Sequence, residues 1–188
     1  MMRGLNKTAA AIHRAALEMT DEFGFDGWTM EHLADRVGVS RRTLFNHVPS
    51  KMDAVLGPEQ EPDPELLEAF LSGGPTGHVG RDLGALVRTV LDAEPIDHDE
   101  LVLVRHILAT DRQVLDAART RFEQIAVHFS EVISEREGDQ MTPELAGVVL
   151  HLVIVVFNAS LDAYLANPSA GTVADHFTRI FDDLVDLF

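Results

Sequence analysis

Four basic side chains lie in a short stretch without an acidic residue, although the chain has a formal net charge of −16. The stretch is "VGVSRRTLFNHVPSK", residues 37–51, and its basic residues are Arg41, Arg42, His47 and Lys51. Arginine presents a fork of donors that fits guanine edges and phosphate oxygens, whereas carboxylates at the same place would repel a phosphate backbone. The stretch therefore predicts contact with DNA.

The charge is divided unevenly along the chain. Acidic and basic residues balance within residues 1–56, so residues 57–188 carry the whole excess of negative charge. Exposed charges farther apart than the Debye length, about 8 Å at physiological salt, are largely screened from one another. The segment "GPEQEPDPE" begins where the charge changes and is typical of a linker. We therefore predict a DNA-binding domain at residues 1–56 and a second domain at residues 57–188.

Two short helices separated by a glycine are predicted to position the arginines. Thr29 caps the first helix, and Gly38 ends it. Ser40 caps the second helix, and Val39 and Leu44 have the spacing of a hydrophobic staple. This is the layout of a helix-turn-helix, whose second helix enters the major groove and presents its N-terminal residues to base edges.

Helical periodicity continues through the rest of the chain, and no alternating strand pattern persists. Capping boxes are predicted at Thr110 with Gln113 and at Thr172 with Asp175, and a threonine cap at Thr142. Besides the two short helices, helices are predicted over residues 6–23, 51–56, 64–71, 81–93, 98–109, 110–132, 143–166 and 173–188. The predicted fold is all-α, with an N-terminal three-helix helix-turn-helix domain and a C-terminal helical bundle for ligand binding and dimerisation.

An enzyme is the main alternative from another functional class, and the sequence argues against it. The nine histidines include no pair four residues apart, and no Glu-x-x-His, phosphate loop, Gly-x-Ser-x-Gly or cysteine occurs. We therefore predict no catalytic residue, no metal and no cofactor. The other alternative is a helical adaptor or small-molecule-binding protein whose helix-turn-helix no longer binds DNA.

Residues 9–56 resemble the DNA-binding domain of tetracycline-repressor-type (TetR family) transcriptional regulators. The likeness lies in the order helix, Gly-aromatic, Thr-capped helix, "GVS", recognition helix, aromatic-x-His and "SK". The resemblance implies a ligand-responsive repressor that binds a palindromic operator in double-stranded DNA as a homodimer. With the helix cap included, the predicted DNA-binding residues are Thr29, Ser40, Arg41, Arg42, Thr43, Phe45, Asn46, His47 and Lys51.

This stretch departs from the family pattern at two positions. Phe45 stands where the family often has tyrosine, so a phosphate-binding hydroxyl is missing, although a phenylalanine can contact a thymine methyl group. Val48 stands where an aromatic residue usually follows the histidine. His47 has a second interpretation, as a buried hinge between two helices.

The second domain is predicted to dimerise and to bind a small, largely apolar effector. The segment "LVIVVF", residues 152–157, is apolar on all faces, so one face is expected to meet a symmetric partner through helices 143–166 and 173–187. The predicted effector-binding residues are Phe70, Ile107, Phe122, Phe129, His151 and Asn158. The alternatives are that the aromatic residues form plain core, and that His151, Asn158 and Asp162, which form a polar stripe on helix 143–166, face solvent or the dimer partner.

The sequence also indicates where the protein works. The N-terminus lacks the apolar core and the cleavage site of a signal peptide, and "LVIVVF" is far shorter than the roughly 20 apolar residues that span a bilayer. The chain contains no cysteine, so nothing points to an oxidising compartment. We expect a cytoplasmic protein without a membrane partner.

Overall fold

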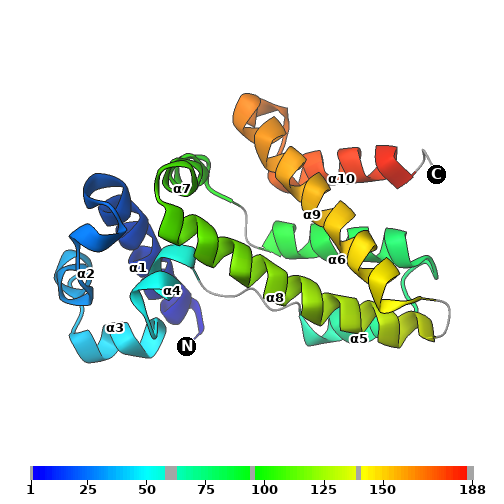
Figure 1. The fold of residues 1–188 in the computed structure, drawn as a ribbon, viewed down its shortest axis with the longest axis horizontal. Coiled ribbons are helices and arrows are strands. Elements are labelled where there is room, and N and C mark those ends of the chain that lie inside the picture. Colours follow the sequence, from blue (N-terminus) through cyan, green and yellow to red (C-terminus); the bar gives the residue numbers. More distant parts are fainter. Residues whose placement is uncertain (1, 58–62, 94–95, 139–140, 186–188) are drawn as a thin grey trace. The chain divides into compact units, whose positions relative to one another are not determined.

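The computed structural model confirms the all-α prediction (Figure 1). It describes residues 2–57, 63–93, 96–138 and 141–185, and within these ranges it contains helices and no strand. The helices are α1 (Met2–Phe23), η1 (Phe25–Gly27), α2 (Met30–Val37), α3 (Arg41–His47), α4 (Lys51–Leu56), α5 (Pro64–Leu71), α6 (Val79–Ala93), α7 (His98–Thr110), α8 (Arg112–Glu137), α9 (Pro143–Ala166), η3 (Pro168–Ala170) and α10 (Val173–Val185).

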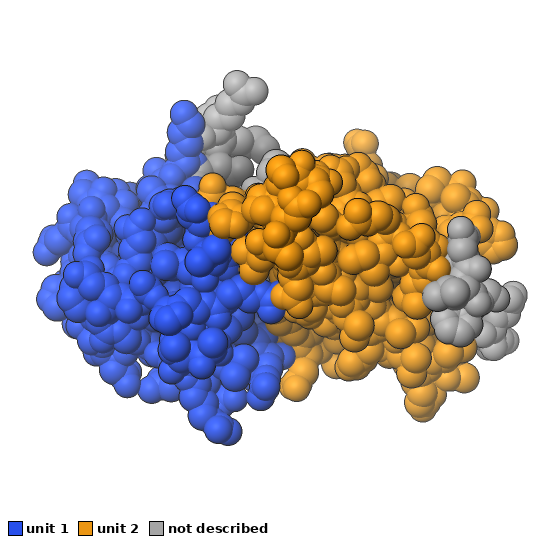
Figure 2. All heavy atoms as spheres, turned by 90° about the horizontal axis from the view of Figure 1, so that it is seen from above, with its two compact units in different colours: residues 1–59, 99–121 blue, residues 60–98, 122–188 orange. Residues whose placement is uncertain are grey.

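The chain forms two compact units, which Figure 2 distinguishes by colour. Unit 1 contains residues 1–59 together with residues 99–121, and unit 2 contains residues 60–98 and 122–188. The predicted division at residue 57 follows the charge and the prolines, whereas the compact units follow the packing. The linker predicted from residue 57 onward falls largely on residues 58–62, which lie outside the described residues.

Unit 1 is built around α1, which packs against α2, α3 and α4. Leu33 of α2 and Leu44 of α3 are fully buried in its core. Ile107 of α7 and Val114 of α8 are buried in the same cluster, which explains why residues 99–121 belong to this unit. Burial of such side chains contributes about 1.5–3 kcal/mol each, so α7 and the start of α8 stabilise the helix-turn-helix.

Unit 2 is built around α10, which packs against α9 and α6, while α5 packs against α6. Phe177 and Phe181 of α10 stack with ring centres 5.3 Å apart. Gly84 of α6 allows this packing, because a Cβ atom there would lie 2.5 Å from the Phe181 ring. The core of unit 2 therefore lies mainly between α6, α9 and α10, and Val132 and Ile133 of α8 are buried in the same cluster.

The predicted caps are confirmed with one exception. The hydroxyl of Thr142 accepts from the backbone N–H of residue 145, and Thr172 and Asp175 form a reciprocal capping box. The cap predicted at Thr110 is wrong. Thr110 belongs to α7, and α8 is capped by Asp111, whose Oδ1 accepts from the backbone N–H groups of residues 113 and 114 at 3.0 and 3.1 Å. A carboxylate is the stronger acceptor for free helix amides.

Candidate DNA-binding surface

The turn between α2 and α3 is fixed by backbone hydrogen bonds. Gly38 ends α2 with a φ of 76°, and its N–H donates to the carbonyl oxygen of Ala34 at 2.9 Å. The N–H of Val39 donates to the same carbonyl at 3.0 Å. A positive φ is costly for residues with a Cβ atom, so glycine suits this position. The turn therefore sets the direction in which α3 leaves α2.

Ser40 and Leu44 fix the start of α3. The hydroxyl of Ser40 accepts from the N–H of Thr43 at 3.1 Å and contacts the Thr43 hydroxyl at 2.8 Å. Leu44 is fully buried beneath the helix, and Val48, just after it, is 7% exposed. Val48 therefore takes part in the core at the position where the family usually has an aromatic residue.

The outer face of α3 presents four exposed residues, Arg41, Arg42, Phe45 and Asn46. Phe45 is 40% exposed, which is high for an aromatic ring and is typical of residues at interaction sites. The predicted base-reading residues of α3 thus stand on one accessible helix face, while Thr43 and His47 are half-buried. The half-burial of His47 is compatible with both interpretations, a contact with DNA and a hinge between two helices.

Two further predicted residues have local structural tasks. Thr29 is exposed and caps α2, because its hydroxyl accepts from the N–H of His32 at 3.3 Å. The ammonium group of Lys51 donates to the carbonyl oxygen of Trp28 and lies over the rings of Phe25 and Trp28, 4.8 and 4.2 Å from their centres. Burial lowers the pKa of Lys51, and nearby carboxylates oppose this shift. Lys51 thus ties α4 to the Gly-aromatic turn.

Sequence reasoning missed one charged neighbour of the arginines. Nη1 of Arg41 lies 2.6 Å from Oε1 of Glu31, in the first turn of α2. A second pair joins Arg36, in the last turn of α2, to Glu22 of α1 at 3.3 Å. The sequence shows Glu31 only as an acid near a helix start, since its contact with Arg41 depends on how α2 and α3 cross.

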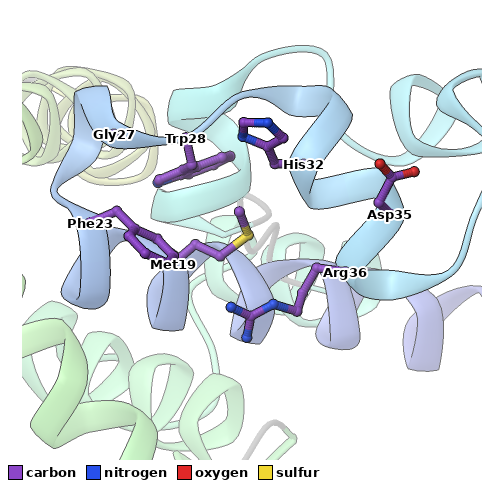
Figure 3. Close-up of a pocket in the computed structure, with 7 residues that line it drawn as sticks. All are labelled: Met19, Phe23, Gly27, Trp28, His32, Asp35 and Arg36. Carbon is purple, nitrogen blue, oxygen red and sulfur yellow. The ribbon is translucent and has the colours of Figure 1, made fainter.

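A cavity of about 370 Å³ lies between α1, η1 and α2 (Figure 3). Its lining residues are Met19, Phe23, Gly27, Trp28, His32, Asp35 and Arg36. Met19 and Trp28 are buried members of the unit 1 core, and the indole N–H of Trp28 donates to the hydroxyl of Thr20 at 3.1 Å. The cavity thus lies at the outer edge of the unit 1 core.

The predicted effector-binding residues are distributed over both units. Phe70 is buried in the core of unit 2, where Phe129 packs against the same cluster, whereas Ile107 is buried in the core of unit 1. Phe122 is 45% exposed. His151 and Asn158 are exposed on α9. Nδ1 of His151 forms a hydrogen bond with the carbonyl oxygen of Gly147 at 2.7 Å, and Nδ2 of Asn158 donates to the carbonyl oxygen of Ile154 at 2.9 Å. Their role in effector binding remains a prediction.

Unit 2 also contains a deeply buried ion pair. The carboxylate of Asp82 on α6 and the guanidinium of Arg136 on α8 contact each other, and their side chains are 0% and 2% exposed. Asp82 also accepts from the backbone N–H and the hydroxyl of Thr76 at 2.7 and 2.6 Å.

In the part of the chain that the structure describes, no group of three acidic or histidine side chains could hold a metal ion.

The helix-turn-helix matches a known family model. Residues 12–55 match the model of "Bacterial regulatory proteins, tetR family". A relative from Streptomyces glaucescens, "HTH-type transcriptional regulator TcmR", is 27% identical over 164 residues, which are 84% of this chain and 71% of that protein. Sequence likeness therefore extends beyond the DNA-binding region.

Two solved structures share the fold over nearly the whole chain. One is NalD of Pseudomonas aeruginosa, the secondary repressor of the MexAB-OprM multidrug efflux pump, with 21% identity, a TM-score of 0.55 and coverage of 96% of this chain and 95% of that chain. The other, from Mesorhizobium loti, is assigned to the TetR family, with 17% identity, a TM-score of 0.53 and coverage of 97% of both chains. Residues 12–55 therefore carry a helix-turn-helix of the TetR type, and the chain is similar to a transcriptional regulator over most of its length.

Proposed function

We propose that this protein is an effector-responsive repressor that binds a palindromic operator as a homodimer. The observation that carries the proposal is the exposed face of α3, where Arg41, Arg42, Phe45 and Asn46 project from a helix fixed at its start by Ser40. Such a helix can enter the major groove with its N-terminal arginines toward base edges. The repressor role draws support from NalD, which is named as a repressor.

The homodimer is supported by an unusual apolar stripe on α9. Leu145, Val148, Leu152 and Val155 recur at steps of three, four and three, and each is 47–64% exposed. The opposite side of α9 carries buried residues such as Val153. Exposed apolar patches of this kind mark interaction sites, and a two-fold axis lets the same stripe meet its copy. Two recognition helices would then read half-sites about 34–36 Å apart.

The same stripe accounts for the high apolar content of α9. By length and composition α9 could cross a membrane, with a mean hydropathy of 2.0 over an 18-residue window. Core helices of globular proteins pass this test too. One face of α9 packs against α10, and dimerisation would cover the other. We therefore keep the proposal of a cytoplasmic protein that works on DNA.

Helix α8 offers a route from effector to DNA. Residues 112–121 belong to unit 1, and the helix continues into unit 2 from Phe122. Just before α8, the carboxylate of Asp111 accepts from the backbone N–H of Phe25 at 3.1 Å. Farther along α8, Arg121 donates to the carbonyl oxygen of Gly57 at 2.7 Å and to the carboxylate of Asp53 at 2.9 Å. We propose that a small, largely apolar effector bound in unit 2 shifts α8 and changes the spacing of the recognition helices, which requires differential affinity for the two states.

The proposal is tested by fluorescence anisotropy with the DNA upstream of the protein's own gene. Binding driven by phosphate contacts weakens steeply with salt, because each contact releases counterions. We expect specific binding whose affinity falls as salt rises from 50 to about 200 mM. Absent or salt-independent binding would favour the alternative of an adaptor whose helix-turn-helix does not bind DNA.

Replacing Arg42 with alanine tests the role of α3 directly. We expect specific binding to weaken by about 1–3 kcal/mol, because a bidentate contact with a guanine edge contributes about this much. Anisotropy titration of the operator duplex measures the effect. Arg112→Ala is the matched control, since Arg112 is an exposed arginine of unit 1 on α8 rather than on the recognition helix. Equal affinities for wild type and Arg42→Ala would exclude Arg42 from the contacts.

A further inference from the structure

Arg41 differs from the other exposed residues of α3 because two side chains hold its guanidinium. Nη1 lies 2.6 Å from Oε1 of Glu31, and the guanidinium carbon lies 5.5 Å from the centre of the Phe45 ring. Glu31 belongs to α2, and Phe45 lies one turn farther along α3. A long side chain with many rotamers is thus restrained from two directions.

We propose that Glu31 is a positioning residue for Arg41 and a determinant of operator specificity, an inference that rests on the proposed DNA-binding function. The side chains of Arg41 and Glu31 are 66% and 52% exposed, so their ion pair adds little to folding stability. Its effect lies in orientation. A guanidinium carries five N–H donors in a rigid plane, so a carboxylate at Nη1 leaves donors for a second partner.

Orientation of this kind favours a base contact over a phosphate contact. Bidentate recognition of guanine needs two donors in a fixed plane, and a side chain ordered before binding loses less entropy when the contact forms. Phosphate contacts tolerate many directions and carry no sequence information. The carboxylate of Glu31 also repels phosphates whatever the sequence. Glu31 therefore weakens binding to any DNA while it sharpens the choice between sequences.

The test separates orientation from charge with two variants of the full chain. The probes are a duplex that the wild-type protein selects from a random-sequence pool and a scrambled duplex of the same composition. For Glu31→Ala we expect tighter binding to the scrambled duplex and a ratio of the two affinities that falls about five-fold or more. Glu31→Gln keeps an acceptor oxygen at the same reach, so both affinities should rise with most of the ratio kept.

Glu22→Ala is the matched control, because Glu22 pairs with Arg36 at 3.3 Å in the same unit, from α1 rather than beside α3. We expect the affinity ratio of this variant to equal that of wild type. Circular dichroism shows whether each variant keeps its helices. An unchanged ratio in Glu31→Ala, with a discriminating wild type, would overturn the inference alone, whereas a wild type that selects no sequence would overturn the proposed function as well.

Discussion

Replacing Asp82 with asparagine is expected to lower the free energy of unfolding by about 3 kcal/mol, the lower end of the range for breaking a buried ion pair. The substitution removes the buried carboxylate that pairs with Arg136, whereas Glu137, with Oε1 3.0 Å from Nε of Arg136, remains. The Arg136 side chain is 2% exposed, so bulk solvent does not reach its guanidinium to take the place of the carboxylate. Its guanidinium carbon lies 4.4 Å from the centre of the Phe70 ring. Urea denaturation followed by circular dichroism measures the loss.

A matched control lies on the same helix. Asp92 of α6 pairs with Arg88 at 3.2 Å, with side chains 51% and 38% exposed, so Asp92→Asn should cost less than about 1 kcal/mol. The double variant Asp82→Asn with Arg136→Met removes both buried charges and should recover part of the stability. Equal losses for Asp82→Asn and Asp92→Asn would show that burial does not govern the pair.

The pH dependence of the same variant gives a second prediction for this site. Burial raises the pKa of Asp82, but hydrogen bonds from Thr76 and Arg136 outweigh it, so the net pKa lies below the usual value of 3.8. A lowered pKa in the folded state means that the carboxylate stabilises the fold above the unfolded pKa and loses this effect as pH falls through the folded pKa. The difference in free energy of unfolding between wild type and Asp82→Asn should therefore become smaller below about pH 4. A difference that widens there would contradict the assignment.

Replacing Val155 with glutamate is expected to produce a monomer and to weaken operator binding by two orders of magnitude or more. Val155 is 64% exposed in the apolar stripe of α9. A charge buried without a partner in an interface costs several kcal/mol, and a monomer holds only one half-site, whereas specific affinities of about 10⁻⁸–10⁻¹¹ M are typical of the full site. Analytical ultracentrifugation and anisotropy titration measure the two effects.

The control for this experiment is Val127→Glu. Val127 is 62% exposed on α8, so the substitution adds the same charge at a similarly exposed valine outside α9. We expect this variant to remain a dimer with wild-type affinity for the operator. If Val155→Glu stays dimeric, the stripe on α9 is not the interface, and if both variants dissociate, the effect comes from added charge rather than from position.

The local features of the helix-turn-helix could be predicted because they depend on residues a few positions apart. Ser40 caps the residue three positions later, and Gly38 takes the left-handed conformation at the end of α2. These contacts form within one helical turn, whatever surrounds it. The cap of α8 shows the limit of such reasoning, since Thr110 and Asp111 are adjacent candidates and only the end of α7 at Thr110 decides between them.

The effector residues show why a pattern of apolar positions does not determine a site. Periodicity indicates that Phe70, Ile107 and Phe129 lie on buried helix faces, and all three do contact a core. It does not indicate which core, and Ile107 packs with the helix-turn-helix while Phe70 packs with α6 and α8 partners in unit 2. Hydrophobic attraction is non-directional, so an apolar helix face can pack against any other apolar face. Its partner is decided by how all the helices pack together.

The sequence by itself determined the order of the α-helices, the start of the recognition helix at Ser40 and the likeness of residues 9–56 to TetR regulators. Only the tertiary structure decided that residues 99–121 pack with unit 1, that Asp82 meets Arg136 across 54 positions of the chain, and that Glu31 holds Arg41. The physical reason is the range of the forces. Caps and turns are satisfied by neighbouring backbone groups, whereas burial and ion pairing depend on which helices the folded chain brings together.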